Sequence, residues 1–519
     1  MYWSRAAALA ALFLFSVARP VAAQDVTLTS PDGAVEITGT LLGFDGEFYR
    51  VDTRYGELTV DGSGVSCNGP GCPSLTDYVA ELALSGSSTM AEVLLPALVE
   101  GFALRNGWRA ARDTLDDNHF RYSLARPDTG PALAYFTFRV SNTDEGFADL
   151  LANEADIVLA LREIRAGERT RAFEAGMGDM TAGNRSRVLA LDAMVPVVAP
   201  GNPVRRISTP DLARIFAGEI ANWSDLGGPD APIDLHLPDA GSGLSQAVED
   251  RLLRPAGLTL AEGITRHPRS SSLARAVSAD PFAIGIASFA ETGTARALTL
   301  TGACGFSLEA SRRTIKTEDY PLTSPMFLYL PARRLPKVAR EFLLYVQSPA
   351  AQIVIRRAGF VDQAPERIAL NAQGDRFANA IAAAGEEVPL DELQRMIATL
   401  GPLTRLTTSF RFEAGSTRPD AQSRANIAQL ARAIEIGVYD AKTLMFVGFS
   451  DGEGPAEGNR RIALKRAEAV RDAVLAAVKT PGEARVEMSV EAFGEALPMA
   501  CDDSDWGRQV NRRVEIWAR

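Results

Sequence analysis

Two loops near the middle of the chain are rich in hydroxyl groups and glycine. One is Ser85-Gly86-Ser87-Ser88-Thr89, and the other runs from Asp239 to Ser245 (DAGSGLS). Each follows a strand-like run and precedes a helix-like stretch, where unpaired amides and the helix dipole attract anions. Ordinary helix capping uses the same residue types. Two such loops in one region therefore leave capping and anion binding open as alternatives.

A second constellation lies near the C-terminus. Asp451 ends a strand-like run, and Arg466 lies 15 residues later, one turn into a long helix-like stretch that follows a Gly-rich loop. A carboxylate and a guanidinium that face one space suit a zwitterionic amino-acid head group, because each charge finds an opposite partner. A plain salt bridge between strand and helix is the alternative that the spacing also allows.

Histidine and cysteine are scarce, which weighs against metal and nucleophile chemistry. The chain has three histidines and four cysteines, and the histidines (His119, His236 and His267) lie in no recognisable catalytic or metal-binding motif. We therefore expect a protein that is not an enzyme and that has no metal site and no cofactor.

The first 23 residues have the anatomy of a secretory signal peptide. Arg5 supplies the positive charge, Ala6 to Val17 form an apolar run of 12 residues, and Val21-Ala22-Ala23 fits a cleavage site. An apolar run of 12 residues is too short to span about 30 Å of hydrocarbon. The sequence therefore predicts export, with Gln24 as the first mature residue.

Export changes how the cysteines are interpreted, since oxidising compartments permit disulfides. Cys67 and Cys72 enclose a Gly/Pro turn (CNGPGC) and are predicted to form a disulfide. Four cysteines allow three full pairings, so the partners of Cys304 and Cys501 stay undecided.

The charge of the chain is acidic and unevenly distributed. The mature chain has 52 basic and 65 acidic side chains, a formal net charge of −13. Residues 403–519 hold 17 of each sign, so the whole excess lies before them. No nucleic-acid partner is indicated, and any bound anion must be held by local groups against an unfavourable long-range field.

The 519 residues are predicted to form a multidomain α/β protein, and its helices and strands must position these side chains. Residues 24–76 read as a small β domain, and 77–365 alternate strand-like and helix-like runs, which is typical of α/β architecture. Residues 366–402 are Ala-rich and predict a helical linker without strands. Residues 403–519 form another α/β unit, whose long helix has one apolar face for packing on a sheet.

Six segments between about residues 82 and 365 resemble, in order, the PstS-like family of periplasmic phosphate-binding proteins. They are GSSTM (86–90), VPVVAPGNP (195–203), IFAGEIANWSDLGG (215–228), AIGIAS (283–288), YPL (320–322) and SPAAQIVIRRAGFV (348–361). The resemblance implies the type II substrate-binding fold, in which two lobes joined by crossover strands enclose the ligand. An ABC transporter permease is the partner that this family implies.

The same resemblance assigns the anion site residue by residue. Ser87, Ser88, Thr89 and Ser141 would line one lobe, Arg162 is the retained arginine of a family motif, and Gly241, Ser242 and Gly243 would lie on the other lobe. The family's usual serine is Leu161 here, its usual arginine is Pro238 and its usual threonine is Leu244.

The missing arginine bears on ligand affinity. Losing a bidentate pair costs a few kcal/mol, about two powers of ten in affinity. Phosphate, another small oxyanion, a phosphate ester or a lost ligand site all remain open.

Residues from about 405 to 519 resemble the C-terminal peptidoglycan-binding domain of outer-membrane protein A. The resemblance rests on FRF (410–412), SDGEG followed by NRRIALKRA (450–467), FGE (493–495) and NRRVE (511–515). It implies that Asp451 and Arg466 clasp the diaminopimelate of the peptidoglycan stem peptide. Asn459 would belong to the binding loop, and Arg513 to the closing motif.

Together these features predict a non-catalytic periplasmic binding protein that is associated with the cell wall, and they leave a position near the outer membrane open. It would capture a small anion, phosphate first, in an interlobe cleft, and attach non-covalently to peptidoglycan. The alternatives are a wall-attached structural or signalling protein with a lost or altered ligand site, and a periplasmic phosphatase.

Overall fold

The computed structural model describes residues 25–75, 78–127, 130–412, 415–479 and 486–519. The predicted signal peptide, residues 1–23, lies outside the described residues. None of the helices in these ranges has both the length and the apolar character that a membrane crossing requires. The chain divides into two units at Ala80, and each is described separately.

The first unit is the small β domain that the sequence predicts. Its five antiparallel strands have the order β4-β3-β2-β1-β5. The strands are β1 (Asp25–Thr29), β2 (Glu36–Phe44), β3 (Phe48–Thr53), β4 (Gly56–Asp61) and β5 (Ser66–Asn68), with the short helix η1 (Gly62–Gly64). The buried core is small, and Cys67 and Cys72 pack against it and form the predicted disulfide.

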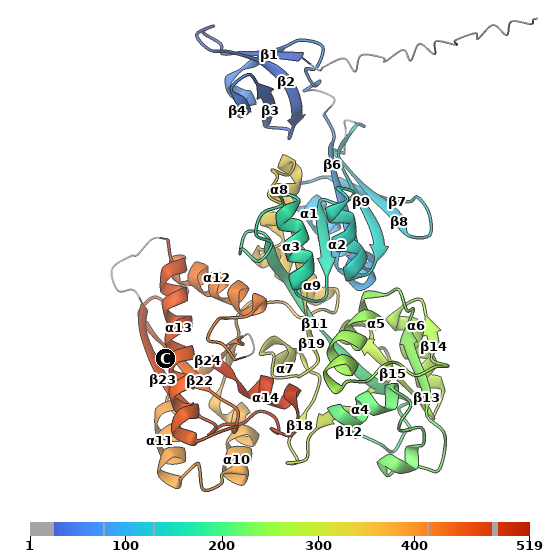
Figure 1. Ribbon diagram of the computed structural model, residues 1–519, viewed down its shortest axis with the longest axis vertical. Coiled ribbons are helices and arrows are strands. Elements are labelled where there is room, and N and C mark those ends of the chain that lie inside the picture. Colours follow the sequence, from blue (N-terminus) through green and yellow to red (C-terminus); the bar gives the residue numbers. More distant parts are fainter. Residues whose placement is uncertain (1–24, 76–77, 128–129, 413–414, 480–485) are drawn as a thin grey trace, which may run out of the picture. The chain divides into compact units, whose positions relative to one another are not determined.

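The second unit begins with two α/β lobes that share two long strands. β11 (Ser186–Val198) and β19 (Thr323–Tyr329) pair with each other and run from one lobe into the other (Figure 1). The first half of β11 lies in lobe 1, whereas its second half pairs with lobe 2. These crossover strands form the hinge of the two-lobed fold that the resemblance implies.

Lobe 1 packs helices on the strand order β19-β10-β6-β9-β8-β7. Its strands are β6 (Ala80–Ser87), β7 (Arg109–Thr114), β8 (His119–Ala125), β9 (Ala132–Ser141) and β10 (Ile157–Ala160). Its helices are η2 (Met90–Leu94), α1 (Leu95–Arg105), α2 (Thr143–Leu151), α3 (Ala166–Glu174), α8 (Lys337–Tyr345) and α9 (Pro349–Arg357).

Lobe 2 is built on the strand order β14-β13-β15-β11. Its strands are β12 (Arg206–Ser208), β13 (Asp234–Pro238), β14 (Thr265–His267), β15 (Ala283–Ser288), β16 (Arg296–Ala297), β17 (Thr299–Thr301) and β18 (Ser307–Leu308). Its helices are α4 (Thr209–Phe216), η3 (Trp223–Leu226), α5 (Gly243–Val248), η4 (Glu249–Leu253), η5 (Arg254–Ala256), α6 (Ser270–Ala279), η6 (Phe289–Glu291) and α7 (Arg312–Lys316).

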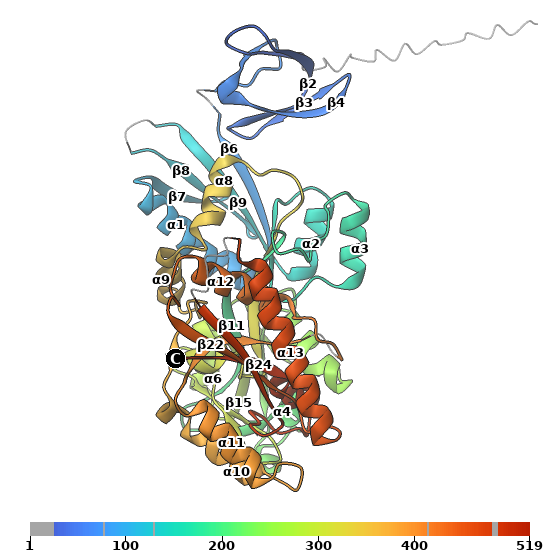
Figure 2. The same cartoon turned by 90° about the vertical axis from the view of Figure 1, so that its left-hand side faces the viewer.

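The C-terminal domain is a five-stranded sheet of order β20-β21-β24-β22-β23 with helices on both faces. Its strands are β20 (Arg367–Ile368), β21 (Thr404–Phe410), β22 (Lys442–Phe449), β23 (Val486–Gly494) and β24 (Arg513–Ala518). Its helices are η7 (Leu370–Gln373), α10 (Gly374–Ala383), α11 (Leu390–Leu400), α12 (Ala421–Glu435), α13 (Ala456–Ala477) and α14 (Asp505–Asn511). Figure 2 shows the long helix α13 alongside this sheet, where its predicted apolar face is buried.

Residues 366–402, the predicted helical linker, are packed into the C-terminal domain and do more than connect two domains. Leu393, Met396 and Leu400 of α11 pack with Phe449 and Trp517 of the sheet. The stretch also contributes the two-residue strand β20, where the sequence predicts no strand. Burial against the sheet explains why an Ala-rich stretch with scattered apolar residues forms two ordered helices.

Candidate functional site

A cavity of about 170 Å³ lies between the two lobes, at the start of three helical segments. Ser88 and Thr89 precede η2, Ser242 caps α5, and Ser270 and Ser271 begin α6. Unpaired amides at such helix starts, together with serine and threonine hydroxyls, form a donor-rich surface. The arrangement can therefore hold an oxyanion.

Four charged side chains also line this cavity. Arg112 comes from β7 and Arg269 from the start of α6, whereas Glu92 and Glu291 supply carboxylates. The Arg269 Nη2 atom lies 3.4 Å from the Glu92 Oε1 atom. Burial raises the pKa of Glu291, Glu92 adds to that rise, and Ser271 and Arg269 oppose it. The cavity thus combines two guanidinium groups with carboxyl groups. The carboxyl groups can accept hydrogen bonds from the O–H groups of a protonated oxyanion.

Some predicted anion-site residues line this cavity and others do not. Ser88, Thr89 and Ser242 line it. Ser87 is fully buried, and an ideal Cβ built on Gly243 would lie only 2.8 Å from the Ser87 Oγ atom and 3.3 Å from Leu161. The two lobes therefore meet where Ser87 and Gly243 were expected to bind the ligand.

Gly86 and Ser141 have local roles beside the cavity. A Cβ on Gly86 would lie 2.2 Å from the Leu159 carbonyl oxygen, so glycine permits the close pairing of β6 and β10. The Ser141 hydroxyl donates to the Asn142 carbonyl at 3.4 Å. Asn142 Nδ2 donates across the lobes to the carbonyl oxygen of Gly241 at 3.2 Å. The hydrogen bond from Asn142 to Gly241 thus joins the two lobes beside the cavity.

Arg162 faces carboxylates of the protein. Its guanidinium pairs with Asp144, with Glu168 at 2.7 Å and with Asp250 at 3.7 Å, and it lines a second cavity of about 210 Å³. Asp250 belongs to lobe 2, so this cluster joins the two lobes. In this conformation the charge of Arg162 is neutralised by protein carboxylates, and its pair with Asp250 stabilises the closed arrangement of the lobes.

Sequence reasoning missed Arg112, Arg269, Ser270 and Ser271. The run Pro268-Arg269-Ser270-Ser271-Ser272 spans the start of a helix and is rich in hydroxyl groups like the two recognised loops, so the same signal could have identified it. Pro238, which stands where the family resemblance expects an arginine, lines the same cavity as Arg269. Arg269 therefore offers a guanidinium from a different loop.

The second candidate site surrounds Asp451 at the end of β22. Asp451 and Arg466 are both more than nine-tenths buried and form no direct ion pair, so the plain salt bridge that the spacing also allowed is not formed. Asp451 instead accepts a hydrogen bond from Arg512 at 2.6 Å. The Arg466 guanidinium lies over the Phe412 ring at 5.2 Å, and its Nε atom donates to the Ser416 carbonyl at 3.3 Å.

The electrostatics at Arg466 favour an anionic partner. Burial lowers the pKa of Arg466, the neighbouring Arg512 lowers it further, and Asp451 opposes both. The Ser450 hydroxyl beside Asp451 is buried and has no hydrogen-bond partner in the described part of the chain. A carboxylate and a guanidinium that are close but not paired with each other can accept an ammonium and a carboxylate from one ligand.

Asn459 and Arg513 have other surroundings. Asn459 donates to the Glu495 carboxylate and to the Gly454 carbonyl, and so stabilises the loop that leads into α13. Arg513 is fully buried, and its guanidinium contacts Glu515 at 2.7 Å and the carbonyls of Asn511 and Leu497. Its charge is directed into the domain interior, whereas its neighbour Arg512 faces Asp451.

Two of the three histidines lie beside each other on adjacent strands. His236 Nδ1 lies 2.8 Å from His267 Nε2 on the adjacent strand, and burial lowers the pKa of both rings. In the portion of the chain with assigned positions, no group of three or more His, Cys, Asp or Glu side chains is arranged to hold a metal ion.

Comparisons with known proteins match two separate parts of the chain. Residues 73–350 match the model of the PBP superfamily domain, and residues 411–512 match that of the OmpA family. "Phosphate-binding protein PstS" of Borreliella burgdorferi is 24% identical over 190 residues, which cover 35% of this chain and 67% of the relative. The protein of the same name from Bacillus subtilis is 31% identical over 189 residues, which cover 36% and 60%.

A relative of the C-terminal part is "Outer membrane porin F" of Pseudomonas fluorescens, 28% identical over 110 residues, which cover 21% of this chain and 31% of the relative. Among solved structures, an ABC-type phosphate transport receptor from Vibrio cholerae matches at 20% identity with a TM-score of 0.41. This match covers 54% of this chain and 99% of the receptor.

Proposed function

Because the chain belongs to the PBP superfamily and carries a C-terminal OmpA-family domain, we propose that it is a non-catalytic binding protein of the cell envelope. Its interlobe cavity takes a small oxyanion, inorganic phosphate first, and its C-terminal domain attaches non-covalently to peptidoglycan. Attachment keeps the binding domain in the periplasm at high local concentration near a partner such as a transporter permease.

The convergence of three helix starts on one cavity supports the anion assignment. Ser88, Thr89, Ser242, Ser270 and Ser271 offer hydroxyl and amide donors there. Arg269 adds a charged donor in place of the arginine that Pro238 replaces. Relatives named phosphate-binding proteins make phosphate the first ligand to test.

Calorimetric titration of the full chain with phosphate, sulfate and a phosphate ester tests the anion assignment. Arg269→Ala should weaken phosphate binding about 100-fold, since a charge-assisted hydrogen bond to an oxyanion contributes about 1.5–3 kcal/mol. Arg275→Ala is the matched control, because Arg275 is exposed on the same helix, α6. Equal affinities for both variants would exclude Arg269 from the ligand site, and no saturable heat with any anion would reject the assignment.

The nearness of Asp451 to Arg466, without an ion pair between the two, supports the wall assignment. The carboxylate can accept the ammonium of the diaminopimelate side chain, and the guanidinium its carboxylate. Arg512 now neutralises Asp451, so the ammonium would take over that contact.

Sedimentation with purified peptidoglycan tests this second site. Asp451→Asn and Arg466→Gln should each reduce pelleting at least tenfold, because each leaves one ligand charge unpaired. Arg461→Gln removes an exposed charge from the same helix and should pellet like the wild type. Normal pelleting of both site variants would overturn the assignment.

A second candidate function is a wall-attached structural or signalling protein without a ligand. The close approach of Gly243 to Ser87 and Leu161 favours it, since it fills a point where the family resemblance expects ligand groups. This candidate predicts wild-type pelleting together with an absence of heat from every anion, whereas the first predicts both activities.

A further inference from the structure

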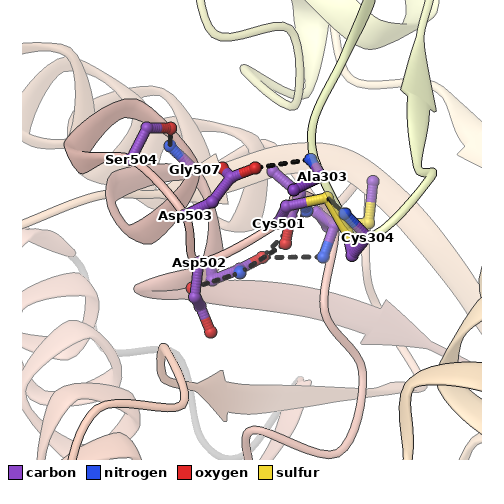
Figure 3. The surroundings of a disulfide bond; sticks show 10 residues. Ala303, Cys304, Cys501, Asp502, Asp503, Ser504 and Gly507 are labelled. Atoms are coloured by element: carbon purple, nitrogen blue, oxygen red, sulfur yellow. Dashed lines mark hydrogen bonds between the residues drawn. A yellow bond between two sulfur atoms is a disulfide. The ribbon is translucent and has the colours of Figure 1, made fainter. Parts of the chain in front are cut away.

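The C-terminal domain is fastened to lobe 2 of the binding domain by a covalent bond. Cys304 follows β17 in lobe 2 and forms a disulfide with Cys501 of the C-terminal domain, 197 residues away (Figure 3). Beside it, the Ala303 amide donates to Asp503 at 2.5 Å. Trp506 packs against the core of lobe 2 and donates to the Arg251 carbonyl at 2.8 Å.

The same domain also contacts lobe 1, through α12. The Ala421 amide donates to Glu163 at 2.9 Å, and the Ala421 side chain belongs to the buried core of lobe 1. Further along α12, Gln429 donates to Gln363 at 2.8 Å, and Arg432 donates to Gln347 at 2.9 Å. One domain therefore bridges both lobes.

A buried charge cluster fixes the domain at the hinge between these contacts. Asp319 lies four residues before the hinge strand β19 and accepts from Arg405 at 2.9 Å and from Arg411 at 3.2 Å. All three side chains are at least 95% buried. Removing one partner of such a cluster leaves an uncompensated buried charge, so the contact resists separation.

The polypeptide itself supplies the second covalent connection. Val361 pairs with Leu191 of the hinge strand, and β20 of the C-terminal domain begins at Arg367. Six residues reach about 20 Å at most when fully extended. Lys316 of lobe 2 contacts Asp362 at 3.0 Å and Glu366 at 2.6 Å, which holds this short connection in place.

We propose that the C-terminal domain is a clamp that holds the two lobes closed, and that the Cys304–Cys501 disulfide locks this clamp. Opening the hinge requires α12 to leave lobe 1, because Cys501 keeps the domain on lobe 2. The covalent link makes the lobe 1 contacts intramolecular and so raises their effective concentration. The inference rests on the proposed function only in treating the interlobe cavity as the ligand site.

The consequence is that ligand exchange is gated by undocking of the wall-binding domain. A binding protein that shuttles must open and close freely, whereas a clamped one stays closed and exchanges its ligand slowly. Contacts between the lobes add to closure, since Arg165 of lobe 1 lies 2.6 Å from Asp250 of lobe 2. The clamp thus acts on a conformation that the lobes themselves favour.

The distance between the lobes tests the clamp without any ligand. Donor and acceptor dyes on non-canonical amino acids at Leu104 in lobe 1 and Glu262 in lobe 2, both exposed, report opening by single-molecule energy transfer. The Cys304→Ser/Cys501→Ser variant should show an open fraction at least about tenfold above the wild type. The matched control, Cys67→Ser/Cys72→Ser, removes the disulfide of the first unit and should match the wild type.

Chemical reduction keeps the test decisive if the double variant folds poorly. A dithiol converts Cys304 and Cys501 to two thiols and is itself oxidised to a disulfide. Applied to the Cys67→Ser/Cys72→Ser protein, it should raise the open fraction, and reoxidation should reverse the change. Identical distances in the oxidised and reduced proteins, or a wild type that opens freely while oxidised, would overturn the clamp.

Radiolabelled phosphate separates this inference from the proposed function. The clamp predicts that phosphate dissociates at least about tenfold more slowly from the oxidised than from the reduced protein. If phosphate does not bind but reduction opens the lobes, the clamp stands and the anion assignment fails. If phosphate binds and its dissociation rate is the same from the oxidised and the reduced protein, the clamp is wrong and the anion assignment stands.

Discussion

Two adjacent arginines of the closing motif have opposite surroundings. Arg512 is partly exposed and pairs with Asp451 at the candidate wall site. Arg513 is fully buried and contacts Glu515, which Arg376 and Arg405 also contact at 2.6 and 3.3 Å. Adjacent residues around the start of a strand point to opposite sides, so one position separates a surface role from an interior one.

Replacing Arg513 should therefore affect stability rather than wall binding directly. Arg513→Met should lower the free energy of unfolding by about 3 kcal/mol, because the buried carboxylate of Glu515 loses a partner. Arg512→Met should change it by less than about 1 kcal/mol. Urea denaturation measures both, and a folded Arg513→Met protein that fails to pellet with peptidoglycan at wild-type stability would contradict this division.

At the scale of elements, the turn between α7 and β19 concentrates charge where the domains meet. Burial raises the pKa of Glu318 to about 8, and Asp420 contributes to this rise. Burial acts in the same direction on Asp319, but Arg405 and Arg411 outweigh it and bring the pKa of Asp319 down to about 2. The guanidinium groups contact the Asp319 carboxylate, which explains why adjacent carboxyls shift in opposite directions.

Glu318 should make the protein less stable as the pH rises. The folded state holds a proton on Glu318 up to about pH 8, whereas the unfolded state loses it near 4.5, so the folded state binds more protons between these values. Unfolding free energy should fall across this window by up to about 1.4 kcal/mol per pH unit. Glu318→Gln should flatten this slope in urea titrations from pH 5 to 8.

The control for this prediction is the exposed Glu457 of α13. Glu457→Gln should retain the wild-type slope. If the unfolding free energy of Glu318→Gln still falls with pH as steeply as that of the wild type, other groups cause the pH dependence.

At the scale of the whole molecule, the charge distribution opposes the proposed ligand. The excess of 13 acidic side chains in the mature chain lies before residue 403, in the part that contains the interlobe cavity. Arg112 and Arg269 must therefore attract an oxyanion locally, within a repulsive field.

Association with phosphate should consequently accelerate with salt. Raising the ionic strength from about 0.01 to 0.15 M shortens the screening length from about 30 to about 8 Å, which weakens the repulsion. We expect the association rate in stopped-flow measurements to rise about twofold. A rate that falls with salt would show that the two arginines dominate the field at the cavity.

The sequence by itself determined the features that depend on local spacing. The long helix expected in residues 403–519 is α13, and the Cys67–Cys72 disulfide closes a turn of the kind that the Gly/Pro residues predict. The two predicted loops do lead into helices, although β6 extends to Ser87 and α5 already begins at Gly243, within the loop predicted at Asp239 to Ser245. These features are local because turn residues, hydrophobic periodicity and helix caps act within a few positions of the chain.

Only the tertiary structure decided which distant groups meet. It paired Cys304 with Cys501, brought Arg269 to the cavity beside Pro238, and placed Arg162 among three carboxylates. It also showed that the expected linker forms a helical layer of the C-terminal domain. That domain contacts both lobes. Each outcome depends on which surfaces bury one another, and burial sets both the partners of a charge and the cost of separating them.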